Sequence, residues 1–251
     1  MMQQYYDIKV ENPDSILMFR LGDFYEMFFD DAIKASEILN LVLTGRDCGL
    51  DERAPMCGVP FHSCDGYIAR LVQSGCKVAI CEQMEDPALA KDIVERSIIR
   101  IVTPGTVIED TMLEEGVNNY LCSVAYLNGD FGMAISDISC GSVKTVKIEG
   151  ANKENRLICE LSRFAPKEVL VDLSTLSMYK KLNSTLTERI SCAVTPIPGE
   201  NFLSGLSAKH IFEHFKTADI STFGLSVNSP ETAALDVLIK YLNDNGMSGL
   251  N

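Results

Sequence analysis

The hydrophobic pattern near the start of the chain predicts a strand followed by a helix. Residues 15–22 form a short apolar run that ends in glycine, which is typical of a buried strand. Apolar residues then recur with helical spacing at Phe28, Ala32, Ala35 and Leu39. Because Asp23 is followed three residues later by Glu26, the sequence also contains a capping-box pattern. We therefore expect the helix to begin at Asp23.

The rest of the first hundred residues predicts further strands and one more helix. The expected strands are residues 41–44, 77–83 and 97–102. Residues 45–60 are rich in glycine, proline and charge, so we expect a loop there. Residues 66–74 predict a short helix that ends at Gly75. The pattern therefore indicates a mixed α/β unit.

A change in composition predicts a domain boundary shortly after residue 100. Pro104 and Gly105 are followed by a polar and acidic stretch that extends to Gly116, which is typical of a connector. We expect a first domain at residues 1–106, a linker at residues 107–118 and a second domain at residues 119–251.

The second domain begins with the pattern of a β-hairpin. Asn128 and Gly129 form a tight-turn dipeptide between apolar residues 120–127 and 131–138, and residues 142–148 predict a third strand. Further helices are expected at residues 151–163, 204–216 and 231–243, and further strands at residues 168–171 and 190–194. Three meander strands followed by alternating helices and strands resemble an RNase H-like layout. The predicted fold class is α/β throughout, and because no element is finished at residue 251 we expect a truncated fragment.

The composition is that of an acidic globular protein. The chain has 251 residues, with 22 Lys+Arg against 35 Asp+Glu and a net charge of −13, which argues against bulk attraction to phosphates. It contains no apolar run of about 18 residues and no signal-peptide pattern, so we expect a cytoplasmic protein that does not contact membranes. Its nine cysteines include no C-x-x-C pair, which predicts free thiols.

Few residues form a pattern that predicts catalysis. The phosphate-binding motif G-x-x-x-x-G-K-[ST] is absent, so we expect no ATP site in these residues. His210 and His214 have the spacing of metal ligands on a helix, but the sequence offers no third ligand. His62 lies between Cys57 and Cys64 in a spacing that matches no familiar zinc site, and we expect it to be a buried loop anchor. We predict no metal site and no catalytic residue.

Two alternatives to a binding function stay open at this point. An RNase H-like nuclease or resolvase would need several carboxylates around Mg²⁺, for which Asp130, Asp137 and Asp172 are an incomplete set. A purely structural interaction domain is the other alternative. In that case Phe24, four residues before Phe28, would be a core residue on the apolar face of the predicted helix.

Residues 22–26, Gly-Asp-Phe-Tyr-Glu, carry a resemblance that periodicity does not supply. They resemble the G-D-F-Y-E signature of the MutS family of DNA mismatch-recognition proteins. Residues 55–62 resemble that family's P-M-x-G-[IV]-P-[YF]-H loop. Residues 78–83, 94–96 and 100–106 follow in the family's order, whereas beyond residue 110 the resemblance is looser. It implies a mismatch-recognition domain followed by an RNase H-like connector domain.

The resemblance also implies roles for particular residues. Phe24 would stack on a mispaired base from the minor groove, and Glu26 would hydrogen-bond that base. The parent protein would be a homodimeric ATPase that uses ATP and Mg²⁺ in an absent C-terminal part and offers surface to MutL, acting on DNA in the nucleoid. The sequence leaves the oligomeric state of the fragment open.

Candidate contacts to the DNA backbone come from the arginines of the first domain. They are Arg46, Arg53, Arg70, Arg96 and Arg100. For each one a solvated surface position is an equally good interpretation. The loop at residues 45–53 contains two aspartates and a glutamate, so it is more acidic than we expect of a loop that faces DNA.

Overall fold

The computed structural model describes residues 1–49, 53–85, 94–109, 112–113 and 117–247. They form two compact units, Met1–Pro104 with Glu109–Met112 and Gly105–Ile108 with Leu113–Asn251. The residues predicted to be a linker, 107–118, are therefore shared between the two units.

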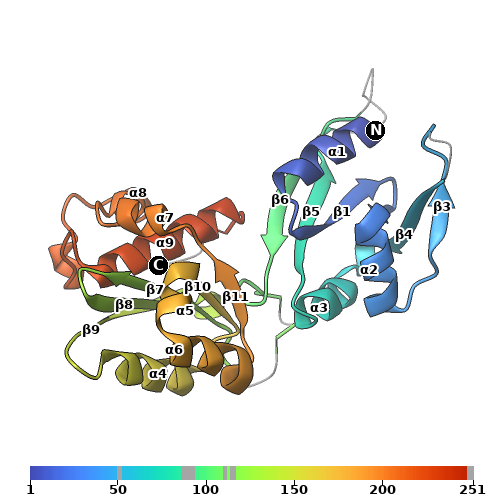
Figure 1. The fold of residues 1–251 in the computed structure, drawn as a ribbon. Helices are drawn as coiled ribbons and strands as arrows, with labels where there is room; N and C mark the ends of the chain where they lie inside the picture. The colour runs from blue at the N-terminus through green and yellow to red at the C-terminus, as the bar shows by residue number, and fades with distance from the viewer. Residues whose placement is uncertain (50–52, 86–93, 110–111, 114–116, 248–251) are drawn as a thin grey trace. The chain divides into compact units, whose positions relative to one another are not determined.

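The first unit is a mixed six-stranded sheet with helices on both faces (Figure 1). Its elements are α1 (Met2–Glu11), β1 (Ser15–Leu21), β2 (Phe24–Phe28), α2 (Phe29–Leu39), β3 (Thr44–Arg46), β4 (Ala54–Pro60), η1 (Phe61–Ser63), α3 (Asp65–Gln73), β5 (Lys77–Gln83) and β6 (Arg96–Val102). The strand order is β3-β4-β2-β1-β5-β6, in which only the β1–β5 pair is parallel.

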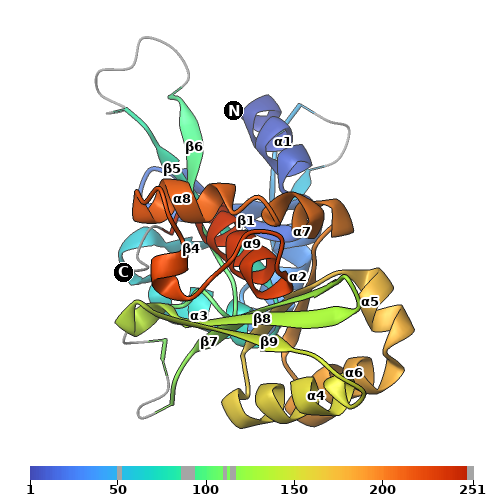
Figure 2. The ribbon, with the colours of Figure 1, turned by 90° about the vertical axis from the view of Figure 1, so that its left-hand side faces the viewer.

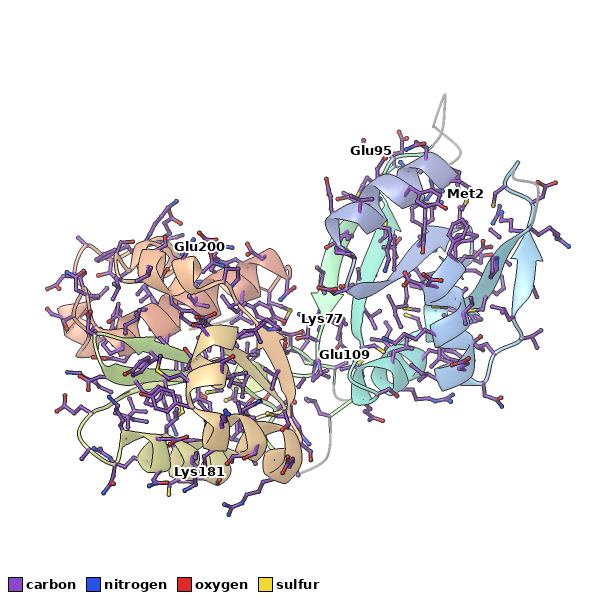
Figure 3. The ribbon with its side chains drawn as sticks, viewed as in Figure 1. Met2, Lys77, Glu95, Glu109, Lys181 and Glu200 are labelled. Carbon is purple, nitrogen blue, oxygen red and sulfur yellow. The ribbon has the colours of Figure 1, made fainter. Side chains whose placement is uncertain are left out.

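The core of the first unit lies on both faces of this sheet. On one face, Tyr5 of α1 packs on Leu17, Phe19 and Phe28, and Met2, labelled in Figure 3, adds to the edge of this cluster. On the other face, α2 and α3 pack on the sheet and bury Met27. The helix α1 thus covers the face of the sheet to which Leu17 and Phe19 of β1 and Phe28 of β2 point.

Residues 24–28 correct the predicted start of the first long helix. They form strand β2, antiparallel to β1 and β4, and α2 begins at Phe29 without a side-chain cap. The predicted capping box of Asp23 and Glu26 is therefore wrong. The aromatic residues of this segment favour a strand, and pairing on both sides supplies hydrogen bonds that a frayed helix end would lack.

The predicted loop at residues 45–60 is wrong at both ends, whereas residues 47–49 and 53 belong to no strand or helix and residues 50–52 lie outside the described residues. Arg46 ends β3, and Ala54–Pro60 form β4, which pairs with β2 and β3. The predicted strand at residues 41–44 shifts to Thr44–Arg46, because Asn40 caps the end of α2 in a left-handed conformation and the backbone N–H of Leu41 donates to the carbonyl oxygen of Ser36. The predicted elements at residues 66–74, 77–83 and 97–102 are confirmed.

The second unit is a five-stranded sheet with two helical layers (Figure 2). Its elements are β7 (Tyr120–Leu127), β8 (Asp130–Asp137), η2 (Ile138–Cys140), β9 (Ser142–Ile148), α4 (Lys153–Phe164), β10 (Glu168–Val171), α5 (Leu173–Met178), α6 (Lys180–Ser184), η3 (Thr185–Ile190), β11 (Ala193–Pro196), α7 (Gly199–Gly205), α8 (Lys209–Phe215), η4 (Ser221–Phe223) and α9 (Pro230–Asp244). The strand order is β11-β10-β7-β8-β9.

The predicted layout of the second unit is confirmed. The strands β7, β8 and β9 form an antiparallel meander, and β10 and β11 extend it in parallel. One face packs on α7, α8 and α9, and the other on α4, α5 and α6. Three details differ. The strand expected at residues 190–194 begins only at Ala193, because Ile190 ends a π-helical turn. The helix expected at residues 204–216 is the shorter α8, with the separate α7 before it, and α5 and α6 lie where no helix was expected.

The cysteines lead to a first testable prediction. All nine are free, four are buried, and burial raises the pKa of Cys57 to about 11 and of Cys81 to about 12. A higher pKa leaves less thiolate at pH 8, and burial blocks access. A thiol reagent at pH 8 should therefore modify the exposed Cys140 and Cys159 first. Mass spectrometry of the labelled peptides checks this order, with urea-unfolded protein as control. Early labelling of a buried cysteine would contradict it.

None of the helices in the described part of the chain has the length and apolar character that a membrane crossing requires.

Candidate nucleic-acid interface

The turn between β1 and β2 presents the motif at residues 22–26. Gly22 has a φ of +57°, a conformation that glycine adopts without strain. The carbonyl oxygen of Asp23 accepts a hydrogen bond from the backbone N–H of Phe61 at 3.0 Å. Nε of Arg20 donates to the carbonyl oxygen of Gly22 at 2.5 Å. The turn is therefore held from β1 and from the end of β4.

A small network of side chains lies beside this turn and consists of Arg20, Tyr25, Phe61 and Glu82. The guanidinium carbon of Arg20 lies 3.4 Å from the ring centroid of Phe61, and its Nη1 lies 3.2 Å from Oε1 of Glu82. The hydroxyl of Tyr25 also donates to Glu82. Burial, together with the Glu82 carboxylate, raises the pKa of Tyr25 well above its usual range, so this donor stays protonated.

Phe24 lies at the first position of β2 and is exposed. Its relative exposure is 47%, whereas Tyr25 and Met27, on the opposite face of the strand, are 5% and 0% exposed. Phe24 is therefore not a core residue, and the pattern-based assignment to the core is wrong. Alternation alone does not explain this, because Phe28 on the same face of β2 is buried against Tyr5 of α1. Phe24 lies at the turn end of the strand and is not part of that cluster.

Glu26 shares its face of β2 with Phe24 and is held by an ion pair. Its Oε2 accepts a hydrogen bond from Nη1 of Arg46 on β3. Gly58 on β4 lies opposite Glu26, and a methyl group there would be 3.5 Å from Cγ of Glu26 and 3.3 Å from the carbonyl oxygen of Tyr25. The approach to Glu26 would be an ordinary van der Waals contact, and the tighter one would be to the backbone of Tyr25.

Two other candidate arginines are engaged within the protein. Arg96 is only 9% exposed, and its guanidinium donates to the carbonyl oxygens of Arg20 and Val94 and lies over the ring of Phe19. Burial lowers the pKa of Arg96. Arg100 forms an ion pair with Glu109. Both side chains therefore stabilise the fold around β6 in this structure.

Arg53 and Arg70 are exposed. Arg70 donates to the carbonyl oxygen of Ile38 at 2.8 Å, and the Cβ of Arg53 lies beside Gly45. Of the sequence-predicted site residues, the structure joins only Glu26 and Arg46 by a direct contact, with Phe24 on the same strand face as Glu26.

The carboxylates proposed for a nuclease each have a local partner. Asp137 accepts from the backbone N–H and the hydroxyl of Ser139, Asp172 caps α5, and Asp130 lies 3.8 Å from Nζ of Lys147. Among the described residues no group of three or more His, Cys, Asp or Glu side chains could hold a metal ion. The nuclease alternative therefore has no assembled metal site in the described ranges.

The histidines give one correction. His62 is exposed, so the expectation of a buried loop anchor is wrong. Nδ1 of His210 lies 2.7 Å from the buried carboxylate of Asp236, which gives this histidine a structural partner.

Comparison with known proteins assigns both units to one family. The family model described as MutS domain I matches residues 1–111, and the model described as MutS domain II matches residues 119–251. The chain belongs to the MutS family. Neither match is to an ATPase domain.

Three curated MutS relatives show how far the similarity extends. A DNA mismatch repair protein MutS from Ruminiclostridium cellulolyticum is 50% identical over 245 residues, which cover 96% of this chain and 27% of that protein. One from Lachnoclostridium phytofermentans is 40% identical over 251 residues, covering 100% of the chain and 26% of the relative. One from Desulforamulus reducens is 52% identical over 172 residues, covering 68% and 20%. The chain spans about a quarter of the length of the first two relatives.

The MutS resemblance indicated only some of the residues that hold the turn between β1 and β2. Phe61 lies within the matching residues 55–62 and Glu82 within the matching residues 78–83, so these segments were available signals that other parts of the chain support the turn. Arg20 lies outside the matching segments, and its contact with Glu82 depends on the pairing of β1 with β5.

Proposed function

We propose that this chain provides the mismatch-recognition and connector domains of a DNA mismatch repair protein. In this proposal Phe24 inserts from the minor groove and stacks on a mispaired or unpaired base, while Glu26 accepts a hydrogen bond from that base. The observation that carries the proposal is the exposed ring of Phe24 beside Glu26 on one face of a hairpin that is held at its turn.

The energetics favour a reader of weak base pairing rather than of sequence. An apolar wedge unstacks a base step at a cost of a few kcal/mol, which is smaller where pairing is already weak. Base–aromatic stacking returns about 1–3 kcal/mol for any base. A single phenylalanine therefore gains most at a mismatch and least in a perfect duplex.

The chain's acidity is compatible with this function if other parts of the protein supply most phosphate contacts. We propose a homodimer in the complete gene product, with ATP and Mg²⁺ bound outside these residues and a MutL-type partner. The DNA would be chromosomal and cytoplasmic. Within the chain, the exposed Arg53 and Arg70 are the remaining candidates for a backbone contact, because Arg46 pairs with Glu26 and both Arg96 and Arg100 are engaged in the fold.

A titration of the complete gene product tests this function. A duplex with one G·T mismatch and its matched twin are compared at one stated salt concentration. We expect about tenfold or more tighter binding to the mismatch, since the stacking gain corresponds to roughly 5–150-fold. Equal affinities would contradict the proposal. So would Mg²⁺-dependent nicking that is lost on Asp137→Asn, which would instead support the nuclease alternative.

A further inference from the structure

The ion pair between Glu26 and Arg46 goes beyond the roles considered so far. It joins β2 to β3 across the intervening strand β4, on which Gly58 lies opposite Glu26. The side chains of Glu26 and Arg46 are 17% and 37% exposed, so the pair lies at the protein surface with Glu26 the more buried member.

The two carboxylate oxygens of Glu26 differ in their surroundings. Oε2 accepts from Nη1 of Arg46. Within the ranges that the structure describes, no protein group donates to Oε1. The guanidinium therefore orients the carboxylate and leaves one oxygen to accept from a ligand, beside Phe24 on the same strand face.

The pair also changes the charge that this surface presents to DNA. A lone carboxylate close to a duplex is repelled by the phosphates, whether or not the duplex contains a mismatch. A guanidinium in contact with it offsets that charge, and planar guanidinium groups hold carboxylates in a fixed geometry. The chain has a net charge of −13, so compensation of the Glu26 charge favours the approach of DNA to the position where Glu26 is proposed to contact a base.

We infer that Arg46 is a positioning residue for Glu26, which orients and charge-compensates the carboxylate so that it discriminates mismatched from matched DNA. This inference rests on the proposed function. It differs from a phosphate contact by Arg46, because a phosphate contact would strengthen binding whatever residue stands at position 26. A positioning role requires that the effect of Arg46 depends on Glu26.

A double-mutant cycle separates these roles in the complete gene product. The variants are Arg46→Gln, Glu26→Gln and the double substitution, each titrated against the G·T duplex and its matched twin. We expect Arg46→Gln alone to lower the mismatch-to-matched affinity ratio about tenfold, within the range of coupling between contacting charged groups. In the Glu26→Gln background the same substitution should change the ratio by less than about threefold.

Arg53→Gln is the matched control. It removes the same charge from the residue before β4, and among the described residues Arg53 forms no ion pair with Glu26. The substitution should therefore weaken binding to both duplexes equally and leave the affinity ratio unchanged. Each variant should keep its melting temperature within about 4 °C of wild type, because exposed ion pairs contribute little stability.

The outcomes distinguish the inference from the function on which it rests. Suppose that the wild-type protein prefers the mismatch but that Arg46→Gln lowers the affinity for both duplexes by the same factor, with glutamate or with glutamine at position 26. Arg46 is then a phosphate contact and the inference is overturned. If the wild-type protein shows no preference, the proposed function itself has failed. The positioning role is supported if Arg46→Gln lowers the mismatch preference when residue 26 is glutamate but not when it is glutamine.

Discussion

Replacement of Phe24 by alanine should abolish the mismatch preference of the complete gene product while leaving its stability almost unchanged. The ring is 47% exposed and is absent from the core of the first unit, so its removal should cost no more than about 0.5–1 kcal/mol of folding free energy. A buried phenylalanine would cost about 3–5 kcal/mol. The lost stacking, about 1–3 kcal/mol, corresponds to a drop of roughly 5–150-fold in affinity for the mismatch.

The measurement is a titration of wild type and Phe24→Ala against G·T and matched duplexes, together with thermal melting of both proteins. Phe223→Ala is a suitable control, because it removes a ring of similar exposure, 51%, from η4 in the second unit. That control should keep the mismatch preference. A Phe24→Ala protein that also keeps it would show that the exposed ring is not the wedge.

The helix predicted from residue 23 shows where hydrophobic periodicity fails. Phe28, Ala32, Ala35 and Leu39 have helical spacing, and the last three do lie buried on α2. The break between strand and helix falls at Phe29, whose φ of +53° lies in the left-handed region that bulky residues rarely adopt. No local sequence signal marks such a corner. Tertiary pairing of β2 with β1 and β4 decides the conformation instead.

The second unit was more predictable because its signals are local. Asn128 and Gly129 have φ values of +53° and +85°, and a type I′ hairpin turn requires a positive φ at both of these positions. The turn sets the register of β7 and β8, in which Tyr126 pairs with Phe131. The helix expected at residues 231–243 is α9, and its start is also locally determined, because the Ser229 hydroxyl accepts from the backbone N–H of Thr232 and Pro230 is the first helical residue.

The site could be predicted only in part, for a related reason. The motif resemblance selected Phe24 and Glu26, and charge alone selected the arginines. Charge does not reveal which arginines are engaged in the fold. Arg96 of β6 contacts Arg20 and Phe19 of β1, since only β5 separates these two strands in the sheet. The contact between Glu26 and Arg46 depends on the order β2-β4-β3, in which β4 separates the consecutive strands β2 and β3. Such contacts require the topology.

Loss of the Asp31 carboxylate should strongly destabilise the first unit. Asp31 lies in the first turn of α2 and accepts hydrogen bonds from the backbone N–H of Leu17 at 3.0 Å, the hydroxyl of Tyr5 at 3.2 Å and Nζ of Lys9 at 2.8 Å. These bonds fix α1 and β1 to α2. Burial and the Asp31 charge raise the pKa of Tyr5 well above its usual range, so Tyr5 remains a donor.

Asp31→Ala leaves the buried N–H of Leu17 without its acceptor and removes the carboxylate from Lys9. Hydrogen bonds to charged groups and unsatisfied buried donors together suggest a loss of about 2–4 kcal/mol, which corresponds to a fall in melting temperature of roughly 10–20 °C for a unit of this size. Circular dichroism measures the melting temperature, and hydrogen exchange along β1 assigns the loss to the first unit. Asp30→Ala is the matched control, because Asp30 is exposed in the same helical turn and its removal should cost no more than about 1 kcal/mol. Equal effects of the two substitutions would show that helix-terminal charge, rather than this buried network, determines the stability. Because the network fixes the sheet from which Phe24 and Glu26 project, we expect Asp31→Ala to weaken the proposed mismatch preference as well.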